Sequence, residues 1–243
     1  MRTIPILYED NHLLIVEKPV NVPVQEDRSG DPDLLSILKQ DLKSRYNKPG
    51  NVYLGLVHRL DRPVGGVMVF AKTSKAASRL ARTLQDRQFE RTYLTVVRGV
   101  PKRKKAFLKN YLLKDRRRNL VSAVPAGTKN AKLAILEYEV LNHEDELSLL
   151  HVKLYTGRSH QIRVQLATVG HPIYGDQKYG KNINKPGQQI ALWAYSVQFP
   201  HPVRDEIISI HQPPPNTFPW NSLTASIALP GGFLEPLDKD QNK

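Results

Sequence analysis

Asp61 stands in the setting of this chain that is most suggestive of chemistry. It lies between Arg59 and Arg62 in a short turn, residues 57–66, that ends in a pair of glycines. Flanking guanidinium groups favour the ionised form of a carboxylate, so the turn would offer an anionic nucleophile or base. The same side chains could instead form an exposed ion-pair cluster of little energetic value. This stretch by itself leaves both interpretations open.

The segments on either side of the turn are apolar and short enough to be strands. Residues 52–57 precede it and residues 67–71 follow it. Apolar runs of this length are typical of buried strands. We therefore expect Asp61 to lie on a connection that a sheet holds at both ends, which would fix the position of its side chain.

The charge balance points to a polyanionic partner. The chain has 36 lysines and arginines against 23 acidic residues, a formal net charge of +13. An excess of this size is typical of proteins that bind nucleic acid and, less often, of proteins that bind anionic membranes. The sequence contains no basic amphipathic helix with aromatic anchors, no apolar run of membrane-spanning length and no signal-peptide core at its N-terminus. We therefore expect no membrane association.

Length and composition predict one large domain. With 243 residues, 40% of them hydrophobic, the chain can bury a core without disulfides or a structural metal. It contains no cysteine, which excludes a disulfide framework and thiolate metal sites and fits a reducing cytoplasm. Because we find no internal repeat and no clear linker, we predict a single domain over residues 1–222. Residues 223–243 are expected to form a weakly packed C-terminal tail.

The rest of the chain contains further strands and three helices. Strand-like runs occur at residues 4–8, 13–16, 91–97, 132–140, 147–155, 191–199 and 207–211. A first helix should follow Asp31 as N-cap with Pro32 at its first position. A second should begin at Thr73 or the residue after it and run to about Gln88, and a third should open within residues 156–163.

Two arginines flank the start of the third predicted helix. Arg158 precedes it and Arg163 lies in its first turns. The free backbone N–H groups and the positive end of the dipole favour anions at a helix start. Arg158 could equally serve as a helix cap.

A second concentration of positive charge lies between residues 102 and 118. It holds nine basic side chains and a single acid, Asp115, with Phe107 and Tyr111 interleaved. Such a run can supply several phosphate contacts to a bound nucleic acid, or it can remain a solvated charge run. The apolar residues that interrupt it favour ordered strands edged with charge.

Three stretches taken together resemble the RluA family of pseudouridine synthases. They are His58-Arg59-Leu60-Asp61-Arg62 with the strand that follows, Arg91-Thr92-Tyr93, and residues 154–163, which read Leu-Tyr-Thr-Gly-Arg-Ser-His-Gln-Ile-Arg. The likeness extends over residues 4–215, and its joint order and spacing are specific although each motif alone is weak. The chain departs from the family pattern at Val64-Gly65, where the family more often has Thr-Ser. We also expect no N-terminal S4-type RNA-binding domain, which many relatives carry.

The resemblance implies an α+β fold with a central mixed, mostly antiparallel sheet whose cleft holds Asp61. It also implies that the protein isomerises uridine to pseudouridine in structured RNA, either ribosomal RNA or transfer RNA. That reaction conserves every atom, so no cofactor, metal or energy source is expected. A hydrolytic glycosidase would usually need two carboxylates, and neither Asp86 nor Asp176 stands in a setting like that of Asp61.

By the same resemblance, three residues form the catalytic set. Asp61 is the catalytic aspartate and Arg163 is its ion-pair partner. Tyr93 lies against the uracil ring as the candidate for taking the C5 proton or for positioning a water that does so. Tyr93 could otherwise be an ordinary strand aromatic. Whether Asp61 attacks C1′, attacks C6 or acts at C2′ stays open.

Four further residues are implied to bind the substrate. Ile162 would pack against the base, unless it is simply a core residue. Arg59 would enter the space left by a uridine flipped out of its stack. Arg62 and Arg158 would contact phosphates.

Other interpretations of these residues remain. His58 and His160 invite a metal site, but no third ligand stands at useful spacing, so structural hydrogen bonds and no metal are expected. One rival function is an RNA-binding or RNA-chaperone protein that has lost the chemistry, which the joint presence of Asp61, Tyr93 and Arg163 disfavours. The other is a nucleoside or base hydrolase that uses Asp61. We expect a monomer in the cytoplasm.

Overall fold

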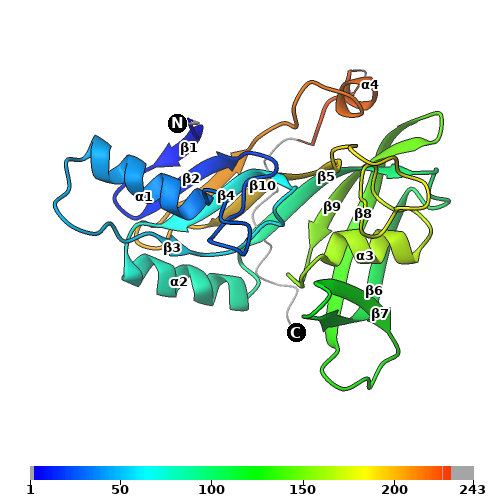
Figure 1. Cartoon of the computed structure of the whole chain (residues 1–243), viewed down its shortest axis with the longest axis horizontal. Helices are drawn as coiled ribbons and strands as arrows, with labels where there is room; N and C mark the ends of the chain where they lie inside the picture. Colours follow the sequence, from blue (N-terminus) through cyan, green and yellow to red (C-terminus); the bar gives the residue numbers. More distant parts are fainter. Residues whose placement is uncertain (1–2, 226, 231–243) are drawn as a thin grey trace.

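The computed structural model of the chain describes residues 3–225 and 227–230. In that part of the chain, eleven strands form one sheet in the order β1-β2-β4-β10-β5-β9-β8-β6-β7, with β3 beside β4 and β11 beside β10 (Figure 1). The pairing of β4 with β10 is parallel and the other pairings are antiparallel. The predicted α+β class and the mixed, mostly antiparallel sheet are confirmed.

The elements begin and end as follows. The strands are β1 (Ile6–Glu9), β2 (Leu13–Lys18), β3 (Gly55–Leu56), β4 (Gly65–Ala71), β5 (Glu90–Arg98), β6 (Lys105–Asp115), β7 (Leu120–Val124), β8 (Lys132–Glu144), β9 (Leu147–Leu154), β10 (Leu192–Pro200) and β11 (Ile207–His211). The helices are α1 (Leu34–Arg45), α2 (Ser74–Gln85), α3 (Gln161–Thr168) and α4 (Trp220–Thr224). The strand predicted at residues 52–57 is wrong for most of its length, because only β3 pairs there.

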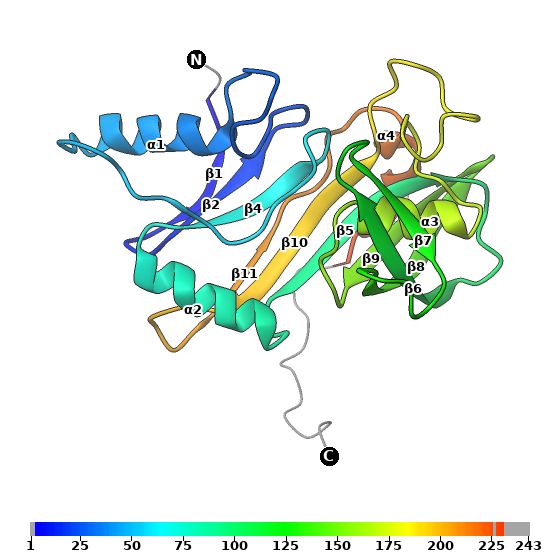
Figure 2. The same ribbon diagram turned by 60° about the horizontal axis from the view of Figure 1, so that its bottom comes forward.

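The sheet has two ends that carry different helices. Figure 2 shows α1 and α2 with β1, β2 and β4 at one end, and α3 with β6 to β9 at the other, joined through β10 and β5. Leu34, Leu38 and Leu42 of α1 belong to one hydrophobic cluster, and Ala76 and Leu80 of α2 belong to another. Successive residues of β2 and β4 supply these two clusters in turn, as the two-residue period of a strand requires. The two helices therefore cover opposite faces of this end of the sheet.

The first helix begins later than predicted. Its N-cap is Asp33, whose carboxylate accepts the backbone N–H of Ser36 at 3.1 Å. The predicted cap, Asp31, is wrong, because its carboxylate forms an ion pair with Arg62. Asp31 and Asp33 stand on either side of Pro32, and aspartate is a favoured N-cap residue. The residue type alone therefore does not show which of the two caps the helix.

The next two helices begin where the sequence predicted, and α2 ends earlier than predicted. Thr73 caps α2 as predicted, but the helix ends at Gln85 rather than near Gln88. The chain turns there because Arg87 has a positive φ of 59°. α3 starts at Gln161, after a turn over residues 156–160. None of the described helices is long and apolar enough to cross a membrane.

The basic run at residues 102–118 is ordered. β6 and β7 form an antiparallel hairpin, with Tyr111 opposite Val124 and Asp115 opposite Leu120. The other edge of β6 is hydrogen-bonded along β8. The prediction of strands edged with charge is confirmed.

The chain after residue 222 begins as packed structure. Leu223 is fully buried, and Ile227 and Leu229 pack against the cluster that contains it. The hydroxyl of Tyr195 donates a hydrogen bond to the carbonyl of Pro230 at 2.7 Å. The predicted weak packing is therefore wrong for these residues, while residues 231–243 of the predicted tail lie outside the described part.

β4 and β10 approach closely at the two glycines that follow the Asp61 turn. Gly65 and Gly66 lie opposite Trp193 and Ala194 in the parallel pairing. A Cβ atom added at Gly66 would lie 2.2 Å from the carbonyl oxygen of Ala194, and Gly66 has a φ of +112°. Both the backbone conformation and the contact therefore require glycine at this position.

We predict that Gly66→Ala lowers the free energy of unfolding by about 3 kcal/mol or more, because it adds a backbone clash to an unfavourable φ. Gly127→Ala is the matched control: Gly127 has a φ of +85° but nothing within 4 Å of the added Cβ. Its loss should be about 1–2 kcal/mol, from the backbone conformation alone. Urea denaturation of both variants measures the difference, and equal losses would contradict the close approach as the cause.

Candidate active site

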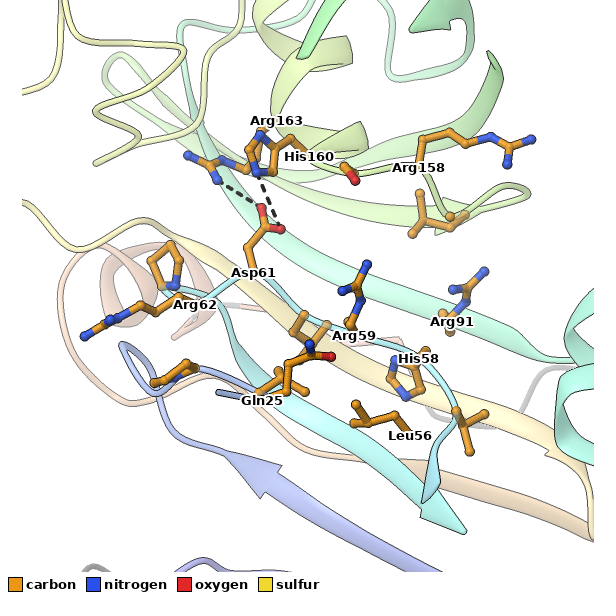
Figure 3. A pocket seen from close by; sticks show the side chains of 18 of the residues that line it. Gln25, Leu56, His58, Arg59, Asp61, Arg62, Arg91, Arg158, His160 and Arg163 are labelled. Atoms are coloured by element: carbon orange, nitrogen blue, oxygen red, sulfur yellow. Dashed lines mark hydrogen bonds and ion pairs between the residues drawn. The ribbon is translucent and has the colours of Figure 1, made fainter. Parts of the chain in front are cut away.

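Asp61 lies in a cleft of about 970 Å³. The cleft is lined by residues 23–27, the turn at 56–63, residues 157–160, and Lys114 and Asn119 near the tip of the β6–β7 hairpin. In Figure 3 the Asp61 side chain points across the cleft toward the elements opposite it. The Asp61 side chain is 27% exposed to solvent, so a ligand in the cleft can reach the carboxylate.

Arg163 holds Asp61 from the other side of the cleft. Its Nη1 donates to Oδ2 of Asp61 at 2.9 Å. Its Nε and Nη2 donate to the two carboxylate oxygens of Asp176, each at 2.8 Å. The ion pair predicted between Asp61 and Arg163 is therefore present, and a second carboxylate fixes the guanidinium plane that makes it.

Burial and charge pairing oppose each other in this trio. Burial raises the pKa of the Asp176 carboxyl, but the hydrogen bonds and charge of Arg163 outweigh it and bring the pKa below its ordinary value. Burial lowers the pKa of Arg163, and the two carboxylates raise it above its ordinary value. Arg163 is thus one cation paired with two carboxylates, of which Asp61 is the accessible one and Asp176 the buried one.

The neighbouring Arg62 points away from Asp61. Its guanidinium forms an ion pair with Asp31, and its Nη1 lies 2.9 Å from the Ser29 hydroxyl and 3.7 Å from a carboxylate oxygen of Asp27. The expectation that both flanking arginines stabilise the ionised Asp61 is therefore wrong for Arg62. An acidic loop engages this guanidinium instead.

Arg59 and Arg158 line the cleft. The Arg59 side chain forms no hydrogen bond or ion pair with any other described residue, so its guanidinium is available to a ligand. Nε of Arg158 donates to the carbonyl of Leu133 at 2.9 Å. The N-cap of α3 is His160, with no side-chain cap hydrogen bond, so the alternative in which Arg158 caps α3 is wrong.

A smaller cavity of about 70 Å³ opens beside Asp61. Tyr93 and Ile162, both nearly buried, line it together with other aliphatic side chains. Burial and the charge of Asp61 raise the pKa of Tyr93, while Arg91 lowers it. The phenol therefore keeps its proton at neutral pH. Its hydroxyl makes no hydrogen bond within the described part of the chain, so it can serve a ligand.

His160 faces the second oxygen of Asp61. Its Nε2 lies 3.9 Å from Asp61 Oδ1, and its Nδ1 lies 2.6 Å from the hydroxyl of Tyr179. That hydroxyl also accepts the backbone N–H of Val121 at 3.0 Å. Burial lowers the pKa of His160 to about 4 although Asp61 raises it, so the ring is neutral at pH 7. The predicted structural hydrogen bond of His160 is present.

His58 is a buried residue in the wall of the cleft. Its Nε2 accepts the backbone N–H of Val69 at 3.2 Å. Burial and the charge of Arg91 lower the pKa of His58 to about 3, so this ring is also neutral. Across the described residues, no three histidine, cysteine or acidic side chains gather in a way that could hold a metal ion.

Lys18, which was not predicted from the sequence, supports the turn from behind. Lys18 is fully buried, and its Nζ donates to the carbonyls of Pro19 at 2.9 Å, Arg62 at 3.0 Å and Val64 at 2.7 Å. It therefore binds the turn at two carbonyls that directly follow Asp61. The signal in the sequence is a lysine at the end of an apolar strand, since a buried ammonium needs partners.

The role of Asp176 was also not predicted from the sequence, where it was considered only as a second catalytic carboxylate. It anchors Arg163 instead. The signal lies in the preceding Gly175, which has a φ of +76°, and an added Cβ there would lie 2.2 Å from the carbonyl oxygen of Gln189. A glycine required by the backbone turns the chain so that the next carboxylate faces inward.

Comparisons with known proteins agree with this geometry. A family model described as RNA pseudouridylate synthase matches residues 12–168. An uncharacterized RNA pseudouridine synthase of Aquifex aeolicus is 36% identical over 231 residues, which cover 88% of this chain and 71% of the relative. The ribosomal large subunit pseudouridine synthase D of Haemophilus influenzae is 31% identical over 250 residues, which cover 96% of this chain and 73% of the relative.

The fold has solved counterparts. The structure of human RNA pseudouridylate synthase domain containing 1 superimposes with a TM-score of 0.72 at 24% identity, covering 88% of this chain and 85% of the human chain. The structure of human RNA pseudouridylate synthase domain containing 4 superimposes with a TM-score of 0.72 at 23% identity, covering 87% of this chain and 88% of the human chain. At this level of identity the likeness supports the fold alone.

We predict that Lys18 makes stability depend on pH. Burial lowers the pKa of Lys18 to about 7, against the raising effect of Asp61. The unfolded chain then binds more protons than the folded one between about pH 7 and the ordinary lysine pKa of about 10.4, so stability rises with pH in that range.

Relative to Lys18→Met, the free energy of unfolding of the wild type should increase by about 1–2 kcal/mol between pH 7 and pH 9. Urea denaturation at several pH values measures it. Parallel pH dependences for the two proteins would show that Lys18 has an ordinary pKa.

Proposed function

The chain belongs to the RNA pseudouridylate synthase family, and on this premise we propose that it converts specific uridines of structured RNA to pseudouridine with Asp61 as the catalytic carboxylate. The observation that carries the proposal is the accessible Asp61, held through one oxygen by Arg163 and open to the cleft at the other. The family model covers this residue and Arg163 together.

The reaction needs what this cleft provides. The N1–C1′ bond of uridine breaks, the uracil turns, and a C5–C1′ bond forms, so no atom is gained or lost overall. An oriented carboxylate can act as nucleophile or base in these steps. Arg163 keeps one oxygen of Asp61 fixed, which leaves Oδ1 as the oxygen that reacts.

The neighbours of Asp61 suit a nucleotide that has left its stack. Ile162 and Tyr93 line the inner cavity, where we propose that they contact the uracil ring. The protonated hydroxyl of Tyr93 would position the water or group that accepts the C5 proton. Arg59, which is not engaged by any described residue, would fill the gap left in the RNA stack. Arg158 would contact the phosphate backbone.

Arg62 is proposed to contact RNA only after it leaves Asp27 and Asp31. Both pairs are exposed, and exposed ion pairs contribute little to stability. A phosphate could therefore replace the two carboxylates at small cost. The phosphate contact expected from the sequence thus requires an exchange of partners, because the guanidinium is not free.

The charge around the cleft suits RNA. Seven lysine or arginine side chains line it, against three acidic ones: Arg59, Arg62, Arg91, Lys114, Arg158, Arg163 and Lys178, against Glu26, Asp27 and Asp61. The tip of the β6–β7 hairpin extends this surface, because Lys114 and Asn119 border the cleft. The opposite end of β6 is about 30 Å away, since the strand is 11 residues long at about 3.3 Å each.

The target RNA is proposed from the relatives. The Haemophilus influenzae protein and several others are named as ribosomal large subunit pseudouridine synthases. We propose large-subunit ribosomal RNA as the first substrate to test and transfer RNA as the second. We further propose that the protein acts as a monomer in the cytoplasm, where both RNAs are found.

We predict that Asp61→Asn abolishes pseudouridine formation while the protein still folds and binds RNA. The isosteric amide keeps the shape of the side chain and removes the nucleophile, so the rate should fall by about 10³-fold or more. Asp86→Asn is the control, because Asp86 is exposed and does not line the cleft.

The measurement is carbodiimide mapping of pseudouridine in total RNA from cells that lack the gene and carry the wild type or a variant, followed by assays with purified protein. Restoration by Asp61→Asn would defeat the proposed mechanism. Release of free uracil by the wild type would identify a hydrolase, and binding without turnover would identify an RNA-binding protein.

We also predict that the hairpin tip binds RNA. Changing Arg116, Arg117 and Arg118 to alanine should weaken binding and lower the slope of log Kd against log salt by about one for each phosphate that the protein no longer touches. The matched control changes Lys102, Arg103 and Lys104, which removes the same charge at the far end of β6. Both are measured by RNA titrations at several salt concentrations. Equal effects would indicate net charge rather than a defined surface.

A further inference from the structure

One hydrogen-bonding atom of the cleft wall is directed at the free oxygen of Asp61. It is Nε2 of His160, which lies 3.9 Å from Asp61 Oδ1, too far for a hydrogen bond. The ring is directed at Asp61 in Figure 3 and lines both the main cleft and the inner cavity. In the described part of the chain, the ring makes its hydrogen bond through Nδ1 alone.

The contacts of Tyr179 determine where the imidazole carries its proton. The Tyr179 oxygen accepts the backbone N–H of Val121 at 3.0 Å, and its own proton needs an acceptor. Nδ1 of His160, 2.6 Å away, provides one. A neutral imidazole that accepts at Nδ1 carries its proton on Nε2. The N–H group therefore faces Asp61 and the cavity.

The proposed reaction creates a charge that such a donor can stabilise. When the N1–C1′ bond breaks, its electron pair stays with the uracil, whose negative charge spreads over N1, O2 and O4. The C5–C1′ bond is then made with an electron pair of this ring, and the proton on C5 passes to a base. Between the two steps the base is detached and anionic. A donor that protonated it would remove the electron density that the second step requires.

A neutral imidazole meets this requirement. Burial lowers the pKa of His160 to about 4, so at neutral pH the ring holds a single proton and is a poor acid. A fixed N–H dipole in a partly enclosed site stabilises developing negative charge without reorganisation. An oxygen placed between His160 and Asp61 could accept from Nε2 while the sugar carbon approaches Oδ1.

The geometry points to His160 as a catalytic residue whose Nε2–H donates to a carbonyl oxygen of the detached uracil, with Tyr179 as the positioning residue that fixes its tautomer. This inference rests on the proposed function and specifies one contact of the same site. It assigns a donor to the base itself, whereas Arg163 serves the carboxylate.

The test uses His160→Asn. Asparagine, like histidine, tolerates the positive φ of 52° at this position. Its amide reaches about as far as Nδ1, so it can keep the contact with Tyr179 while lacking the Nε2–H group. The substrates are three versions of one oligoribonucleotide that spans a uridine identified by the carbodiimide mapping, with uridine, 2-thiouridine or 4-thiouridine at the target. Sulfur is a weak hydrogen-bond acceptor.

Single-turnover rates at saturating protein are compared. On uridine, His160→Asn should react about 10²-fold more slowly, with the Kd for RNA changed less than about twofold. The wild type should lose a similar factor on one of the two thio substrates. On that substrate, His160→Asn should lose little more, because the hydrogen bond is already absent.

Equal losses by His160→Asn on all three RNAs would make its role structural and overturn the proposal. A wild type that converts all three RNAs at one rate would also overturn it. Tyr179→Phe keeps the histidine and its backbone and is the second variant. Its ¹⁵N spectrum should show a mixture of tautomers and its rate on uridine should fall, and an unchanged spectrum and rate would contradict the positioning role.

Failure of the proposed function has a different signature. In that case the wild type forms no pseudouridine on the unmodified oligoribonucleotide, whatever the variants do. Asp61→Asn, assayed in parallel, separates a missing donor from a missing nucleophile. It should be inactive on all three substrates, without the selectivity expected for His160→Asn.

Discussion

The site depends on one buried cation shared by two carboxylates. Two of the three guanidinium nitrogens of Arg163 donate to Asp176, and the third nitrogen donates to Asp61. Were Asp61 the sole partner, the guanidinium could rotate with it, and neither group would have a fixed orientation. The buried carboxylate removes that freedom, so the accessible one is held in place without being enclosed. Its remaining oxygen can then react.

The features that the sequence predicted well are those set by local pattern. Apart from residues 52–57, the apolar runs of strand length fell on strands, because burial on both faces of a sheet leaves a continuous apolar signature. Asp61, Tyr93, Ile162 and Arg163 come together as the family resemblance implied. Asp61 and Arg163 form an ion pair, and Tyr93 and Ile162 line the cavity beside it, although β10 separates β4 from β5 in the sheet.

The features that the sequence did not predict depend on partners far away in the chain. Lys18 binds carbonyls 44 and 46 residues away, and nothing near it in the sequence marks them. Asp176 is defined by its contact with Arg163, which becomes visible only when the loop that carries it is folded. The prediction for Arg62 was wrong because it relied on a neighbour in the sequence rather than on a distant partner. Arg62 is adjacent to Asp61 in sequence, but a loop some 30 residues earlier competes for it.

The order of the strands has a consequence for biosynthesis. β10 lies between β4 and β5, although it is made after nearly all the other strands. Until residues 192–200 have left the ribosome, the segment that ends in β4 and the segment that starts with β5 each have an unpaired edge, which other chains could join. Asp61 belongs to the first segment and Arg163 to the second, so a nascent chain carries both residues long before it holds them together. The active site therefore forms in one late step, when β10 closes the sheet. A chain whose synthesis stops before β10 contains all of the site residues but does not hold them together.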